Sequence, residues 1–206
     1  MINVIREIVS ETKVIRFEGN NYAPEWIEEA ARRGLPNLAR TPEALEQLVR
    51  PESVEMFVSM GVLTEHEVHA RYHVRLERYL KDVLIEIDTL IDMARTQVMP
   101  AAIEHQGMLA RSIEAVSRVK GQVPATQTGL LDACTEEINR LRERADGLES
   151  LVRELDGIEE KERARRYAYE VVPAMQAVRQ SCDHLEEMVS DSLWPLPKYP
   201  EMLFLS

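Results

Sequence analysis

The sequence contains few of the residues that β-sheets, disulfide scaffolds and membrane spans require. Its 206 residues include only 8 glycines and 2 cysteines, and aromatic side chains make up 5% of the chain. Few aromatics beside many Glu, Arg, Leu and Ala favour helices over sheets. No stretch approaches the roughly 20 apolar residues that cross a bilayer, and the N-terminus has no secretory signal pattern. We therefore expect a soluble, cytoplasmic, mainly helical protein with no membrane partner.

The sequence also has fewer basic than acidic residues. The chain has 25 Lys and Arg against 36 Asp and Glu, a formal net charge of −11. Such a chain repels a phosphate backbone, and no basic cluster is dense enough to reverse that, so nucleic acid is not expected as a partner. The cysteines, Cys134 and Cys182, lie at apolar positions of helical repeats. They are expected to be buried thiols in a reducing compartment rather than a disulfide or a metal site.

The first 62 residues are a succession of short segments. Ile2, Ile5, Ile8 and Val9 predict a small amphipathic helix, and residues 13–18 alternate as a short strand would. The run from Gly19 to Asn21 predicts a turn, because Gly and Asn tolerate positive φ. We interpret this region as the edge of a larger domain.

Three further short helices are expected before residue 63. One starts at Pro24 and stops at Gly34, the next opens at Thr41, and the last runs from Pro51 to Gly61. Proline is favoured in the first turn of a helix and glycine just after its end.

After residue 63 apolar residues recur every three or four positions in long stretches, as in antiparallel helical bundles. A capping box formed by Thr64 and Glu67 opens the first stretch. The three stretches run from Thr64 to Gly121, from about Thr128 to Asp156 and from Ala164 to Val189. Pro100 should kink or split the first helix and Pro173 should kink the last.

The C-terminal segment has a different composition. Residues 193–206 contain three prolines, which disfavour a regular helix, together with apolar residues that include Trp194, Leu196, Leu203 and Phe204. Such residues are rare in free tails, so this segment should dock on its own chain or on a neighbour. The predicted fold class is all-α: an elongated antiparallel helical bundle of three to four long helices. Short helices and one possible short strand precede it, and an extended proline-rich tail ends it.

Residues with catalytic or metal-binding potential are few. His66, His69 and His73 share one helical face at spacings that allow zinc ligation, but no fourth ligand is near in sequence. We interpret them as ordinary helix-face histidines, with zinc as the weaker alternative. The sequence has no glycine-rich phosphate loop and no nucleophile elbow. The prediction is therefore that the chain holds no catalytic, cofactor-binding or metal-binding residue.

Several regions resemble type III glutamine synthetases. Residues 17–26, 29–38 and 41–45 resemble the region that follows the family's catalytic core. Residues 61–72, 91–94 and 99–101 are similar to the start of its C-terminal helices. The tail, residues 193–199 with Leu203 and Phe204, resembles the family's extreme C-terminus. These matches keep the family's order along nearly the whole chain.

The resemblance implies a fragment of a longer enzyme, a large oligomer of stacked rings that makes glutamine from glutamate, ammonia and ATP with a divalent metal such as Mg²⁺. Residues 1–62 would border the catalytic domain, 63–192 would form the bundle and 193–206 the tail. Its implied partners are the catalytic domain and other subunits. None of the family's catalytic residues lies in the matched region. We assign Asn20 only a structural role. At Asn21 this sequence departs from the family pattern, which has Gly or Asp at that position.

Two function hypotheses follow. In the first, the chain is the C-terminal helical domain of such an enzyme, with a structural, assembly or regulatory role and no catalysis of its own. In the second, it is a free-standing helical adaptor whose apolar stripes pair with partner helices, with the tail as a docking peptide.

Overall fold

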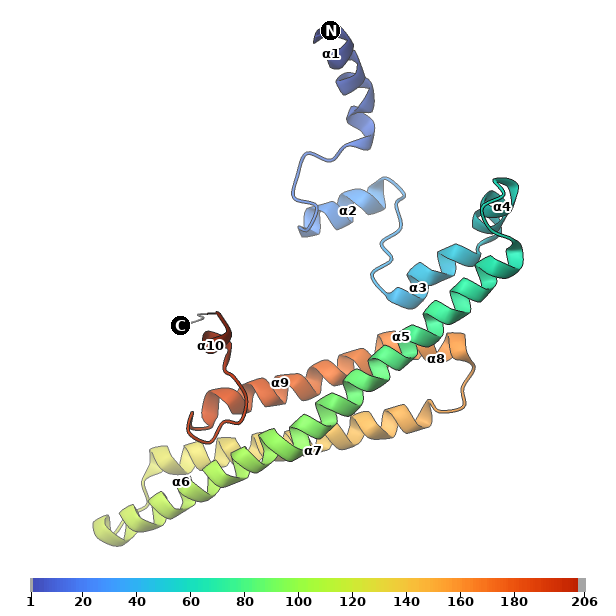
Figure 1. Ribbon diagram of the computed structural model, residues 1–206. Coiled ribbons are helices and arrows are strands. Elements are labelled where there is room, and N and C mark those ends of the chain that lie inside the picture. The colour runs from blue at the N-terminus through green and yellow to red at the C-terminus, as the bar shows by residue number, and fades with distance from the viewer. Residues whose placement is uncertain (1, 204–206) are drawn as a thin grey trace. The chain divides into compact units, whose positions relative to one another are not determined.

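Helices make up the regular structure of this chain (Figure 1). The computed structural model describes residues 2–203, with the side chains of Val14, Tyr199 and Pro200 left out of the description. No strand occurs within these residues, which confirms the all-α prediction. The chain divides into two compact units, an N-terminal unit Met1–Arg40 and a C-terminal unit Thr41–Ser206.

The N-terminal unit contains α1 (Ile2–Glu11), a 3₁₀ turn (Thr12–Ile15) and α2 (Pro24–Arg32). The strand expected at residues 13–18 is therefore wrong. A strand needs a partner for its ladder of hydrogen bonds, and the described residues offer none. The segment instead continues the end of α1: the Thr12 hydroxyl donates to the Ile8 carbonyl at 2.7 Å, and the Arg16 guanidinium donates to the Val9 carbonyl at 2.6 Å.

The turn expected after residue 18 is present but is built differently. The side-chain oxygen of Asn20 accepts a hydrogen bond from the Tyr22 amide at 3.0 Å, and the Ala23 amide donates to the Asn20 carbonyl at 3.0 Å. Among the described residues positive φ occurs only at glycines, namely Gly34, Gly61, Gly121 and Gly157. The predicted turn therefore forms without positive φ, because an Asn side chain that closes its own turn does not need that conformation.

The C-terminal unit begins with short helices that pack on the first turns of the first long helix. These are α3 (Thr41–Glu46), a 3₁₀ turn (Gln47–Val49) and α4 (Pro51–Ser59). Leu45 and Val49 lie against the core of the bundle. The short helices after Thr41 therefore belong to the bundle.

The first long helix runs without a break from Glu65 to Lys120, about 84 Å at ~1.5 Å per residue. It comprises α5 (Glu65–Met93), a π-helical turn (Ala94–Val98) and α6 (Met99–Lys120). The predicted capping box is confirmed, since the Thr64 side chain accepts from the Glu67 amide and the Glu67 carboxylate accepts from the Thr64 amide.

Pro100 does not interrupt this helix. A proline has no N–H and its ring crowds the carbonyl four residues earlier. The preceding turn widens, and the Met99 amide donates to the Ala94 carbonyl five residues back. Pro173 has the same effect: between α8 (Glu160–Arg166) and α9 (Val172–Met188) lies a second π turn, Tyr167–Val171. In both places the π turn ends two residues before the proline, so the bundle has three long helical arms rather than four.

The middle arm is α7 (Ala125–Glu154), which returns antiparallel to α6 and contacts α9 along its length (Figure 1). The arm formed by α8 and α9 then lies against α5. The predicted apolar stripes meet in the core, where the largest fully buried aliphatic side chains are Leu76, Ile87, Val98, Leu141, Leu148, Leu155, Val171, Val178 and Leu185. The predicted antiparallel helical bundle is confirmed.

The tail folds back onto the bundle. Amides of Leu193 and Trp194 donate to the Ser190 carbonyl, which reverses the chain, and Leu193, Trp194 and Leu196 pack against the core. The tail is not extended throughout, because α10 (Tyr199–Leu203) is a short helix with Pro200 in its first turn, where no N–H is needed. Phe204 and Leu205 lie outside the described residues.

Candidate functional site

The interior of the bundle is filled by apolar side chains, which bury one thiol and partly bury the other. Cys134 is buried and Cys182 is half-buried, and both are free. Burial raises the pKa of both thiols, that of Cys182 to about 11. A thiol is a nucleophile or a metal ligand only as the thiolate, so at neutral pH these side chains act as small apolar residues.

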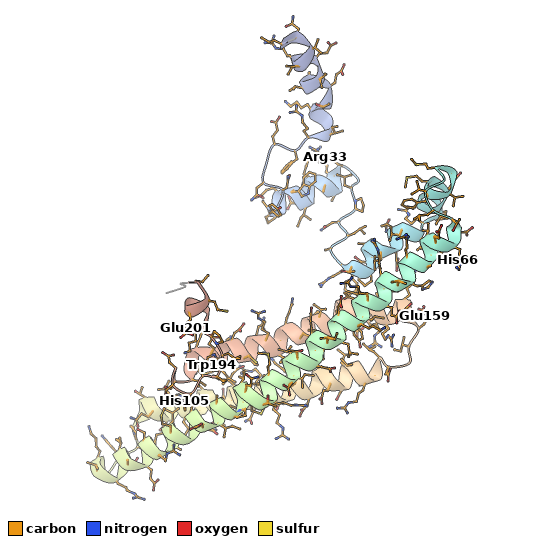
Figure 2. All side chains as sticks on the ribbon, viewed as in Figure 1. Arg33, His66, His105, Glu159, Trp194 and Glu201 are labelled. Atoms are coloured by element: carbon orange, nitrogen blue, oxygen red, sulfur yellow. The ribbon has the colours of Figure 1, made fainter. Side chains whose placement is uncertain are left out.

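The three histidines of α5 do not assemble into a site. His66 is exposed near the start of the helix (Figure 2), His69 faces α4 beside Pro51, and the Nδ1 atom of His73 lies 3.3 Å from a Glu160 carboxylate oxygen on α8. Among residues 2–203 no group of three or more His, Cys, Asp or Glu side chains is placed to hold a metal ion. The same residues include no helix that is long and apolar enough to cross a membrane.

A group of ion pairs joins the first π turn to α7. The Arg95 guanidinium reaches Glu149 at 2.6 Å and Asp146 at 2.7 Å. The hydrogen bond from Arg95 holds the pKa of Glu149 below its usual value, and the two carboxylates raise the pKa of Arg95. This contact fixes the two arms relative to each other at the point where the helix widens.

A second polar contact sets the register of α7 against α9. Arg144 donates to the Ala177 carbonyl at 2.7 Å and to the buried Ser181 hydroxyl at 2.9 Å. The buried carboxylate of Glu137 pairs with Arg140 and lies 3.6 Å from the Nδ1 atom of His184. These residues could not be identified from the sequence, because the partners are far apart in sequence and carry no motif. They bind the arms to each other and contain no nucleophile with a neighbouring base.

The N-terminal unit has almost no interior. Its rings Phe17 and Trp26 lie 4.8 Å apart, and the Arg33 guanidinium sits 5.9 Å from the Trp26 ring centre and donates to the Arg16 carbonyl. Ala30 is the one buried residue among those described in this unit. The unit is therefore held by one small cluster around α2.

An apolar surface on α1 has no cover within the N-terminal unit. Ile2, Ile5, Ile8 and Val9, here named the α1 surface, lie at helical spacing, and each is 46% to 73% exposed. None of the residues of α1 is buried. A ten-residue helix is marginal in water without tertiary packing, and a clustered apolar face of this kind marks an interaction site. The α1 surface is the candidate functional site of the chain.

Comparison with known proteins assigns this helical chain to a family. The model of the family described as "Glutamine synthetase C-terminal domain" matches residues 1–117. The chain belongs to this family. The matched part of this glutamine synthetase C-terminal domain includes the N-terminal unit, and therefore the α1 surface, and extends to within three residues of the end of α6.

Individual relatives agree with this assignment. A glutamine synthetase of Bacteroides fragilis (strain YCH46) is 33% identical, with 99% of this chain and 29% of that protein aligned. The type-3 glutamine synthetase of Dictyostelium discoideum is 33% identical over 98% of this chain and 28% of its own length. A glutamine synthetase of Butyrivibrio fibrisolvens is 30% identical over 97% and 29%. The resemblance to type III glutamine synthetases is confirmed, and the chain spans less than a third of each relative's length.

Proposed function

We propose that this chain is a non-catalytic helical part of a glutamine synthetase, and that its α1 surface packs against the rest of that enzyme. The observation that carries the proposal is the exposure of the α1 surface, with Ile5 at 55% and Ile8 at 53%. Fully burying such a side chain is worth roughly 1.5–3 kcal/mol, so four neighbouring aliphatic residues are a substantial driving force for association.

The chemistry would belong to the remainder of the enzyme. The relatives are named glutamine synthetases, and such an enzyme joins ammonia to glutamate with ATP and a divalent metal such as Mg²⁺. The described residues of this chain do not fit those groups: no three potential ligands converge on one point, and the bundle interior is packed with aliphatic side chains. The partners we propose are the catalytic domain and other subunits of a cytoplasmic oligomer.

The adaptor hypothesis has less support. It needs the apolar stripes of the long helices to be free for partner helices and the tail to be free as a docking peptide. The stripes are instead buried against one another, and Trp194 and Leu196 lie on the chain's own core.

A chimera tests the proposal. This chain replaces the aligned segment of the Bacteroides fragilis relative, and glutamine formation and assembly are measured. We expect an active, assembled enzyme that is lost on Ile5→Glu with Ile8→Glu. The matched control is Asn3→Glu with Ser10→Glu, which adds the same charge at exposed polar positions of α1 and should leave activity intact.

Either of two results would overturn the proposal. One is glutamine formation by the isolated 206-residue chain, which would place the chemistry here. The other is a chimera in which both pairs of substitutions have the same effect, which would remove the special role of the α1 surface.

A further inference from the structure

A second apolar surface lies at the start of the bundle, in a cavity of about 320 Å³ between α4 and α5. Its wall is made by Leu48, Phe57, Val62, Leu63 and Val68, and Arg71 and Arg75 complete it. We name it the α4–α5 pocket. Its size falls at the lower end of the range of ligand sites in proteins.

The loop that closes the pocket is fixed by the backbone. Gly61 adopts φ 66°, a conformation that glycine reaches without strain. The amides of Val62 and Leu63 both donate to the Phe57 carbonyl, at 3.0 and 3.4 Å. The capping box at Thr64 then starts α5, and Val68, which is 3% exposed, forms the buried side. The pocket is therefore preformed.

Arg71 and Arg75 lie one turn apart on α5, and both are exposed. Neither forms an ion pair or hydrogen bond with another residue in the described part of the chain. The carboxylate of Glu67, one turn before Arg71, accepts from the Thr64 amide and hydroxyl at 2.8 Å. These hydrogen bonds lower the pKa of Glu67, and the charge of Arg71 contributes a smaller part. Two available guanidinium groups beside an apolar cavity, in a chain of net charge −11, suit a partner that presents apolar side chains next to a carboxylate.

The helix α10 presents that combination. Met202 is 56% exposed and Leu203 is 76% exposed, and the neighbouring Glu201 is exposed as well. The tail anchors this helix on its own chain: Trp194 packs on the core, Met202 lines the same groove as Trp194, and the Lys198 amide donates to the Glu201 carboxylate at 3.2 Å. Figure 2 shows Glu201 beyond Trp194 along the tail. The residues exposed on α10 therefore complement the α4–α5 pocket in both polarity and charge.

The α4–α5 pocket and α10 of the same chain cannot contact each other. In the C-terminal unit α4 lies at the Thr64 end of the bundle, whereas α10 lies beside the far end of α9 (Figure 1). We propose that the α4–α5 pocket binds α10 of a second copy of this chain. The contact is heterologous, so each copy offers one pocket and one α10. This goes beyond the proposed function and involves a different surface from α1.

The test measures self-association of the full chain by analytical ultracentrifugation. Arg71→Glu with Arg75→Glu disables the pocket, and Leu203→Glu disables α10. Each should weaken association about tenfold or more, since each removes a buried apolar contact or reverses the charge beside it. The controls are Arg78→Glu, an exposed arginine of α5 outside the pocket, and Val119→Glu, an 87% exposed valine on α6. Neither control should change the association constant.

Mixing two different variants tests the contact more specifically than either variant alone. A pocket-disabled copy and an α10-disabled copy together retain one working pocket and one working α10, so they should form one-to-one complexes and nothing larger. Adding Glu201→Arg to the Arg71→Glu, Arg75→Glu chain should restore several-fold of the lost affinity by exchanging the charges. All chains in these association experiments, but not the chimeric enzyme, also carry Ile5→Glu and Ile8→Glu, so that association through α1 does not contribute and failure of one proposal is distinguishable from failure of the other.

Three outcomes would overturn the inference. The first is no self-association of the parent chain, and the second is equal effects of test and control variants. The third is a defect of Arg71→Glu with Arg75→Glu only in the chimeric enzyme, which would mean that the rest of the glutamine synthetase, and not a second copy, occupies the pocket.

Discussion

Replacing Trp194 by alanine tests whether the tail is a structural part of the bundle. The ring packs against the core and lines a groove with Leu90, Val98 and Cys182. Truncating a fully buried Trp costs roughly 3–5 kcal/mol, but this ring is only partly buried. Its Nε1 atom is also buried without a hydrogen-bond partner among the described residues, and such a group costs roughly 1–3 kcal/mol in the folded state. The net loss we expect is about 2 kcal/mol.

The assay is urea unfolding of the full chain followed by circular dichroism. Trp194→Phe keeps most of the apolar contact and removes the unpartnered N–H, so it should cost about 1 kcal/mol or less. Trp26→Ala makes the same truncation in the N-terminal unit and should leave the bundle's unfolding unchanged. A free energy of unfolding within about 0.5 kcal/mol of the parent chain for Trp194→Ala, the range of ordinary surface substitutions, would refute the docking of the tail on this groove.

Three further changes test the bundle itself. Leu141→Ala should lower the free energy of unfolding by about 3 kcal/mol, because the side chain is fully buried and its removal leaves a cavity; a loss below about 1 kcal/mol would contradict the packing. Thr64→Ala should cost about 1 kcal/mol by removing the capping box, whereas Thr89→Ala, a mid-helix threonine of the same α5, should not. Glu149→Gln should cost about 0.5–1 kcal/mol at pH 7. The Arg95 hydrogen bond lowers the pKa of Glu149, so this contribution is present above the unfolded pKa of about 4.3 and disappears as the pH falls through the folded value. A pH-independent difference between the two proteins would contradict the ion pair.

The bundle could be predicted because the sequence features that specify it are local and periodic. Apolar residues at spacings of three and four, such as Leu76, Leu80 and Val83, can be buried only on one side of a helix. The capping box at Thr64 was visible for the same reason, since both of its hydrogen bonds join residues three apart. Pro100 was ambiguous because the widened turn that accommodates it depends on packing against α7 and α9 as well as on the proline.

The errors arose where the outcome depends on partners distant in sequence. The alternation at residues 13–18 resembled a strand, but no neighbouring strand exists among the described residues to complete it. The contacts of Arg95 with Asp146 and Glu149 join residues that only the fold brings together. The α1 surface was visible as an amphipathic helix, but its exposure could be seen only in the structure, where the rest of the N-terminal unit does not cover it.

Hydrogen exchange at α1 tests the central claim most directly. The backbone amides of Asn3 to Glu11 are compared between the isolated chain and the chimeric glutamine synthetase that carries it. We predict rapid exchange in the isolated chain, because no residue of α1 is buried, and strong protection in the assembled enzyme. Equally rapid exchange in both would mean that α1 stays uncovered, and would contradict its role as the contact with the rest of the enzyme.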